Sequence, residues 1–174
     1  MKSYLEHLQI VNTFHELGET IAAAQFLIQE YGLENPNFTG FELREKAKPE
    51  FILMTTEGAL GGPQIIRIPE NTFEYPLHLM LNLLMHEMIH VSQKTKENPI
   101  EDKNEREWQA YYEMLFHKKF PQIPELPDFN KRFFAKKALE YYNRMDEGSE
   151  LQLKYATQKL ETDNLLSFLK AKTK

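Results

Sequence analysis

The sequence contains no cysteine, and this absence limits the chemistry that the chain can carry out. Disulfides, zinc knuckles and thiol nucleophiles are excluded, so a bound metal ion has to be held by histidine and carboxylate side chains. A basic patch is also absent, because acidic and basic residues are interleaved along a chain whose net charge is -5. We therefore expect no nucleic-acid partner.

Long, purely apolar runs are absent too. The longest run, residues 77–91, is interrupted by three histidines, an asparagine and a glutamate, and the N-terminal residues carry charges throughout. The apolar run does not have the pattern of a membrane span, and the N-terminal residues do not have that of a signal peptide. We therefore expect a cytoplasmic protein that has no membrane partner. Export that requires no leader sequence is the alternative. The 174 residues, of which 41% are hydrophobic, predict one domain with its own core, residues 1–174.

The chain is organised around Leu77–Gln93, which has the pattern of one long helix that is apolar on nearly every side. Residues four apart in a helix lie one above the other, so His86 and His90 can bind the same metal ion. Glu87 lies about a quarter-turn round the helix from His86, beside whatever the metal holds. This is the HExxH pattern of zinc hydrolases, in which the histidines bind Zn2+ and the glutamate is the general base. Hydrogen-bonded core histidines are the simpler alternative, but three ionisable groups in so apolar a segment would be costly without a partner.

A catalytic zinc usually has a third protein ligand, which the helix itself does not supply. The longer pattern HExxHxxGxxH is not met, because Gln93 stands at the glycine position and Lys96 at that of the third histidine. A metzincin is therefore excluded. His78 lies two turns, about 12 Å, before His86 and cannot share its metal.

The next predicted helix, Lys103–Phe120, offers three glutamates and a histidine as the third ligand. Glu107 falls in the middle of its apolar face, whereas Glu113 points outward and Glu105 completes a cap with an aspartate. A buried carboxylate needs a cation, so Glu107 is the expected ligand, with pairing to an arginine or a tyrosine as the alternative. His117, which lies on the polar side of this helix, is the remaining rival.

These residues resemble the gluzincin clan of zinc metallopeptidases, in which HExxH is completed by a glutamate on a later helix. The resemblance covers the segment around His86 and His90 and the stretch E-W-Q-A-Y that begins at Glu107. It implies an α+β, zincin-like core, a zinc-bound water and hydrolysis of peptide bonds. Many relatives carry an aspartate four residues after the ligand glutamate. Here that position is Tyr111, which can hydrogen-bond a ligand histidine without adding charge or can stabilise the oxyanion.

The HExxH segment is also similar to the SprT-like proteases, whose third ligand is a histidine in an HGxxF-like stretch. The stretch 117–120, HKKF, lacks the glycine of that pattern. A carboxylate-bridged di-iron bundle is disfavoured, because a second Glu-x-x-His motif is missing. A zincin-like fold that binds metal or a partner without catalysis is a further alternative.

The remaining segments predict a mostly helical fold with a small antiparallel sheet packed on the HExxH helix. The expected elements are helices Ser3–Phe14 and Glu16–Tyr31, strands Phe38–Arg44, Phe51–Thr55 and Gln64–Ile68, a proline-rich connector at 121–129, and helices capped by Asn130 and Ser149. The last strand is expected at an edge that can pair with an extended peptide, or else in an ordinary hairpin. We interpret His7 and His15 as surface or capping residues.

Overall fold

The computed structural model describes residues 2–172, which form two compact units. The first unit contains the chain up to Pro99 together with Gln122–Pro124, and the second contains Ile100–Pro121 and the chain from Glu125 onward. Helices and one small sheet confirm the predicted mixture of α and β structure. Within the described residues, no helix combines the length and the apolar character that crossing a membrane requires.

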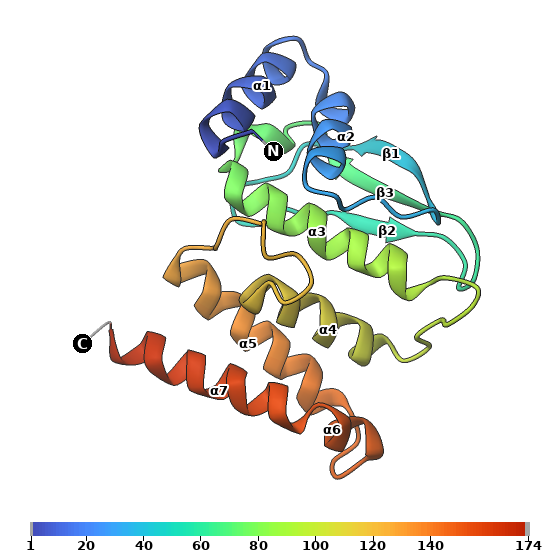
Figure 1. Ribbon diagram of the computed structural model, residues 1–174, viewed down its shortest axis with the longest axis vertical. Coiled ribbons are helices and arrows are strands. Elements are labelled where there is room, and N and C mark those ends of the chain that lie inside the picture. Colours follow the sequence, from blue (N-terminus) through green and yellow to red (C-terminus); the bar gives the residue numbers. More distant parts are fainter. Residues whose placement is uncertain (1, 173–174) are drawn as a thin grey trace. The chain divides into compact units, whose positions relative to one another are not determined.

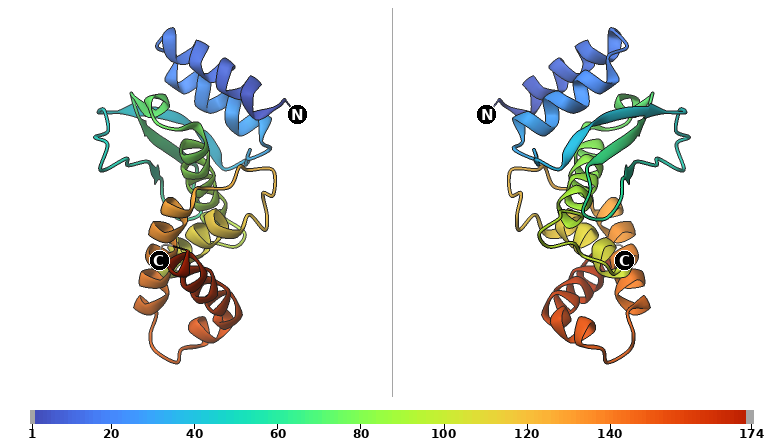
Figure 2. Two further views of the ribbon diagram at one scale, coloured as in Figure 1. Left: turned by 90° about the vertical axis from the view of Figure 1, so that its left-hand side faces the viewer. Right: turned by 90° about the vertical axis from the view of Figure 1, so that its right-hand side faces the viewer.

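The first unit begins with two helices, α1 (Tyr4–Glu16) and α2 (Thr20–Glu30). They lie side by side in both views of Figure 2. Ser3 and Glu6 cap α1 reciprocally through a capping box. The buried face of α2 consists of small and aliphatic residues that are fully excluded from solvent: Ala23, Ala24, Leu27 and Ile28. Burial of each large aliphatic side chain stabilises the fold by about 1.5–3 kcal/mol.

His7 corrects one sequence-based interpretation, because it is buried and not a surface or capping residue. Only 1% of it is exposed, and its Nδ1 lies 2.8 Å from the hydroxyl oxygen of Tyr31. Its Nε2 lies 3.3 Å from a carboxylate oxygen of Glu30. The histidine therefore joins α1 to the end of α2. Its apolar neighbours along the sequence gave no sign of these two polar partners.

The sheet contains β1 (Phe38–Arg44), β2 (Thr55–Glu57) and β3 (Gln64–Pro69) in the order β1-β3-β2 (Figure 1). β1 runs parallel to β3, and β2 runs antiparallel to it, so the sheet is mixed and the prediction of an antiparallel sheet was wrong. The long connection after β1 carries the chain to the far side of β3 before β2 forms, and this allows the parallel pair. β3 is consequently the central strand and not the expected edge, and β2 lies at an edge. β2 also begins later than predicted.

α3 (Leu77–Gln93) has the predicted bounds and packs against β2 and β3, next to the short 3-10 helix η1 (Thr72–Glu74). Its apolar side chains form the centre of the first unit. Those that are fully buried are Met80, Leu81, Leu84, Met85 and Val91, together with Ile66 and Ile68 of the sheet. The continuous apolar pattern of this helix is thus explained by burial on several sides.

The second unit consists of α4 (Lys103–Phe116), α5 (Asp128–Arg144), α6 (Glu150–Lys154) and α7 (Ala156–Ala171). α5 packs on α4 and on α7. Three boundaries differ from the prediction: α4 is shorter, α5 begins before its expected cap, and the last helix is divided at Tyr155. The predicted cap at Ser149 is confirmed, since its side chain accepts from the amide of Gln152.

Trp108 is the centre of the aromatic core of this unit. It is fully buried, and its ring lies 5.1 Å from that of Tyr142 and 5.9 Å from that of Tyr112 between ring centroids. Aromatic pairs at these distances add to the stabilisation by burial. Phe134 and Tyr142 of α5 are also buried, whereas Phe133 is 52% exposed.

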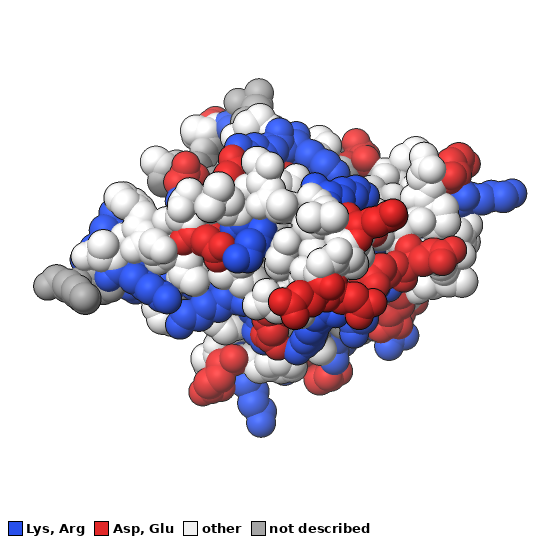
Figure 3. All heavy atoms as spheres, turned by 90° about the horizontal axis from the view of Figure 1, so that it is seen from below, with Lys and Arg blue, Asp and Glu red and all other residues white. Residues whose placement is uncertain are grey.

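Surface charges are mixed on the face of the protein that Figure 3 shows. Lysine and arginine side chains lie next to aspartate and glutamate side chains, and neither sign covers that face continuously. Several neighbours form exposed ion pairs, such as Lys159 with Asp163 at 2.7 Å. Such pairs contribute little to stability.

Candidate metal centre

α3 holds His86, Glu87 and His90 inside the first unit. Their exposed fractions are only 5%, 7% and 8%. The residues around them on the helix are apolar and equally buried. Polar groups in such a position require partners, and the structure provides one for each.

The two histidines point toward each other. Their Nε2 atoms are 3.0 Å apart, and the rings are nearly perpendicular with centroids 4.7 Å apart. This confirms the spacing argument, because residues four apart in a helix do bring both imidazoles together. Two ring nitrogens that converge on one point can bind a single cation when both are unprotonated.

Gln93 fixes the orientation of His90. Its side-chain oxygen lies 2.8 Å from His90 Nδ1, and the glutamine is 4% exposed. An amide oxygen can only accept a hydrogen bond, so Nδ1 carries the proton and Nε2 of a neutral His90 presents its lone pair toward His86. In the sequence pattern, Gln93 was noted only as the residue at the glycine position of HExxHxxGxxH. Its spacing of three residues from His90 on one helix face was the signal for this contact.

Glu87 is held by Thr56 of the neighbouring strand β2. The Thr56 hydroxyl lies 2.7 Å from Glu87 Oε2 and 3.0 Å from the main-chain oxygen of Glu87. The main-chain oxygen of Thr56 in turn accepts from the Lys94 ammonium at 3.3 Å. Nothing in the sequence pattern pointed to Thr56, because the contact joins a strand to a helix about thirty residues later along the chain.

The loop after β2 is anchored to the end of α3. The buried Gln64 side chain donates to the main-chain oxygens of Ala59 and Gly62 at 2.7 and 2.8 Å. The amide of Gly61 donates to the main-chain oxygen of Lys94 at 2.9 Å. These bonds hold the β2–β3 hairpin in place, and with it the Thr56 hydroxyl.

The glutamates of α4 are used differently from one another, and two of them correct the sequence analysis. Glu113, expected to point outward, is 4% exposed and accepts from the amides of Lys119 and Phe120 at 2.6 and 2.9 Å. The chain turns back after α4, and this turn brings both amides over Glu113.

Glu105 is buried as well. The Asp102 cap is confirmed, but the Glu105 carboxylate accepts from Lys154 and Tyr155 of the C-terminal helices.

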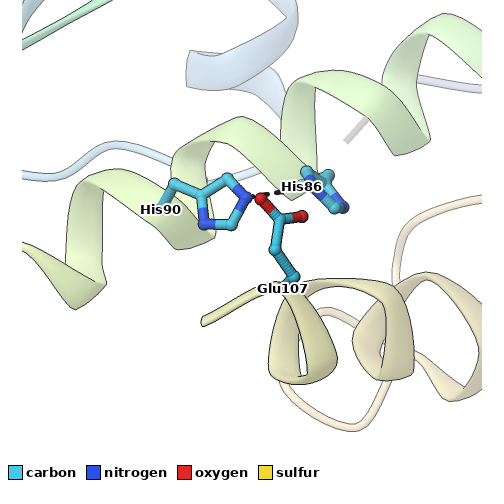
Figure 4. Close-up of side chains that lie close together, drawn as sticks. All are labelled: His86, His90 and Glu107. Atoms are coloured by element: carbon cyan, nitrogen blue, oxygen red, sulfur yellow. Dashed lines mark hydrogen bonds between the residues drawn. The ribbon is translucent and has the colours of Figure 1, made fainter. Parts of the chain in front are cut away.

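Glu107 is half-buried on α4. Within the second unit, burial and then the negative charge of Glu107 raise the pKa of Tyr141. Among the described residues, His86, His90 and Glu107 form the one group of three that could hold a metal ion, with one ligand atom from each within 4.8 Å of the others (Figure 4).

Two other candidates from the sequence lie elsewhere in the second unit. Tyr111 stacks on Phe134 and Tyr141 of α5, with centroid distances of 5.8 Å to both rings. His117 is the residue that ends α4, in a left-handed conformation with φ 45°, and it is buried and not on a polar helix side. Burial lowers the pKa of His117. It does not belong to the group that could hold a metal ion.

No known protein family, curated protein or solved structure matches this chain.

Proposed function

We propose that this protein is a zinc-dependent metallopeptidase of the gluzincin type. The observation that carries the proposal is the buried His86–His90 pair, whose Nε2 atoms converge at 3.0 Å next to the buried carboxylate of Glu87. Two histidines and an adjacent acid at this spacing are the part of a zinc-hydrolase site that one helix can supply, and a third ligand has to come from elsewhere. The order of elements also supports it, because a small sheet precedes the HExxH helix and a helix with a glutamate follows it.

Zn2+ is the metal that suits the donor set. Imidazole nitrogens together with a carboxylate oxygen are typical zinc ligands, and three protein ligands leave a fourth position for water. The Gln93 contact places the proton of a neutral His90 on Nδ1 and leaves the Nε2 lone pair available to a metal. Bound zinc would polarise a substrate carbonyl and lower the pKa of its water.

Glu107 is the proposed third ligand. The other two carboxylates of α4 are occupied, since Glu105 accepts from Lys154 and Tyr155 and Glu113 accepts from two backbone amides. Glu107 is the α4 carboxylate whose oxygen lies within 4.8 Å of the histidine nitrogens.

The proposed reaction assigns one role to each side chain. His86, His90 and Glu107 hold the metal. Glu87 takes a proton from the attacking water and returns it to the leaving amine, so it acts first as general base and then as general acid. Tyr111 is proposed to hydrogen-bond a ligand histidine or to stabilise the oxyanion, and Tyr111→Phe tests it.

Metal analysis of the purified protein is the first test. We expect about one zinc per chain in the wild type, and its loss in His86→Ala and in Glu107→Ala. His78→Ala is the matched control, because it removes a histidine from the same helix without touching the group. Zinc retained by Glu107→Ala would instead favour His117 and the SprT-like alternative, and no zinc in any form would refute the proposal.

Hydrolysis is tested separately with a peptide library and the variant Glu87→Gln. This variant is expected to keep its zinc and to lose turnover, because the amide cannot accept the proton of the water. A protein that binds zinc but cleaves no peptide would be a non-catalytic metal-binding module, the second alternative that the sequence left open. Full activity in Glu87→Gln would contradict the role given to Glu87.

A further inference from the structure

We propose that Thr56 is a positioning residue for Glu87: its hydroxyl holds Oε2 of the carboxylate and leaves Oε1 to exchange the proton. This role rests on the proposed hydrolysis, in which Glu87 is the general base. The contact that carries it is the 2.7 Å hydrogen bond from Thr56 Oγ1 to Glu87 Oε2.

The direction of this bond follows from the chemistry of the two groups. An ionised carboxylate has no proton to donate, so the Thr56 hydroxyl must be the donor. A hydrogen bond to a charged acceptor is stronger than one between neutral groups. The same hydroxyl lies 3.0 Å from the main-chain oxygen of Glu87, so it is placed against both ends of this one residue.

Thr56 is itself held in place from several sides. It pairs with the fully buried Ile66 in the antiparallel β2–β3 ladder. Its main-chain oxygen accepts from Lys94, and its β-branched side chain has few rotamers. The hydroxyl is therefore a fixed point against which the longer glutamate side chain, with its three rotatable bonds, is aligned.

Alignment of this kind matters for proton transfer. A general base has to lie within hydrogen-bond reach of the proton that it abstracts, and a displacement of about 1 Å can cost about 100-fold in rate. A free glutamate side chain has three rotatable bonds and spends much of its time in other rotamers. The Thr56 contact removes this freedom without touching the metal ligands.

The test compares Thr56→Val, which keeps the shape and removes the hydroxyl, with Thr56→Ser, which keeps the hydroxyl. Thr55→Val is the matched control, because the neighbouring hydroxyl contacts the exposed Glu57 at 3.2 Å and not Glu87. The first readout is the crystal structure of each variant. We expect the Glu87 carboxylate to move by about 1 Å or to occupy several rotamers in Thr56→Val alone.

The second readout is zinc content together with steady-state kinetics on a cleaved peptide. Thr56→Val should keep its zinc and its KM and lose about 10- to 100-fold in kcat, whereas Thr56→Ser should recover most of it. An unmoved Glu87 carboxylate in Thr56→Val, or an unchanged kcat, would overturn the proposal. If the wild type cleaves no peptide, the proposed function fails, and the position of Glu87 in the variants still decides whether Thr56 holds it. Should Thr56→Val not fold, Thr56→Ala against Thr56→Ser makes the same comparison.

Discussion

Replacement of Gln93 by leucine is expected to weaken zinc binding by about 10- to 100-fold. Leucine fills a similar volume but offers no acceptor for His90 Nδ1, which now lies 2.8 Å from the glutamine oxygen. Both residues are buried, with exposed fractions of 4% and 8%, so water cannot easily replace the lost acceptor. His90 is then free to place its proton on Nε2, where the metal has to bind.

Two independent arguments give the same magnitude. An orphaned buried donor costs about 1–3 kcal/mol. A 10- to 100-fold loss of affinity corresponds to about 1.4–2.7 kcal/mol. If His90 binds zinc as proposed, the cost of the missing hydrogen bond is therefore expected to appear mainly as a loss of zinc affinity.

The assay is a competition titration of zinc against a coloured chelator at fixed pH. Ser92→Ala is the control, because its hydroxyl contacts only the main-chain oxygen of Ile89 in the same helix. Gln93→Glu keeps an acceptor and adds negative charge, so it should bind zinc at least as tightly as the wild type. At least about a 10-fold increase in the zinc dissociation constant is expected for Gln93→Leu. A value within about twofold of the wild type would refute the reasoning.

Three further predictions concern stability, each measured by urea denaturation. Gly58→Ala should destabilise the protein by at least about 1 kcal/mol, because φ is 147° and the new Cβ would lie 2.4 Å from a backbone oxygen. Gly62→Ala is the control and should destabilise the protein less, because its new Cβ would have no contact below 3.5 Å. Glu113→Ala should lower the free energy of unfolding by about 1–3 kcal/mol for each of the two amides that lose their acceptor. Replacement of the exposed Glu101 by alanine is the control and should have almost no effect, so equal losses in the two variants would contradict the capping role of Glu113. Hydrogen bonds from a backbone amide and a buried histidine lower the pKa of Glu30 from 4.5 to about 2, so its stabilising contribution is complete above pH 4.5 and disappears as the pH falls toward 2. The free energy of unfolding of Glu30→Gln should therefore differ from that of the wild type at pH 5 and above, and an equal difference at pH 2 would argue against this linkage.

The helix α3 was predicted residue for residue, because its signals are local. An apolar pattern bounded by Pro76 and by polar residues after Gln93 defines its ends. The histidine pair followed from helix geometry alone. The strand Phe38–Arg44 was also predicted with its observed bounds.

Sheet topology was not predictable in the same way. β2 and β3 form the hairpin that their short connection suggests, but β1 pairs with β3 in parallel across a long connection. The sequence pattern of β1 is the same whichever neighbour it has. The pairing partner depends on tertiary packing, in which β1 lies against α2 whereas β2 and β3 lie against α3.

The sequence by itself determined the helix that carries HExxH and the facing of its two histidines, because residue type and helical periodicity are properties of a single segment. Only the tertiary structure decided the partners of those side chains. Thr56 reaches Glu87 from another element, and Glu113 turned inward because a later turn of the chain brought two amides to it. Such contacts join positions far apart along the chain or depend on where the backbone reverses, and neither is encoded in a local pattern.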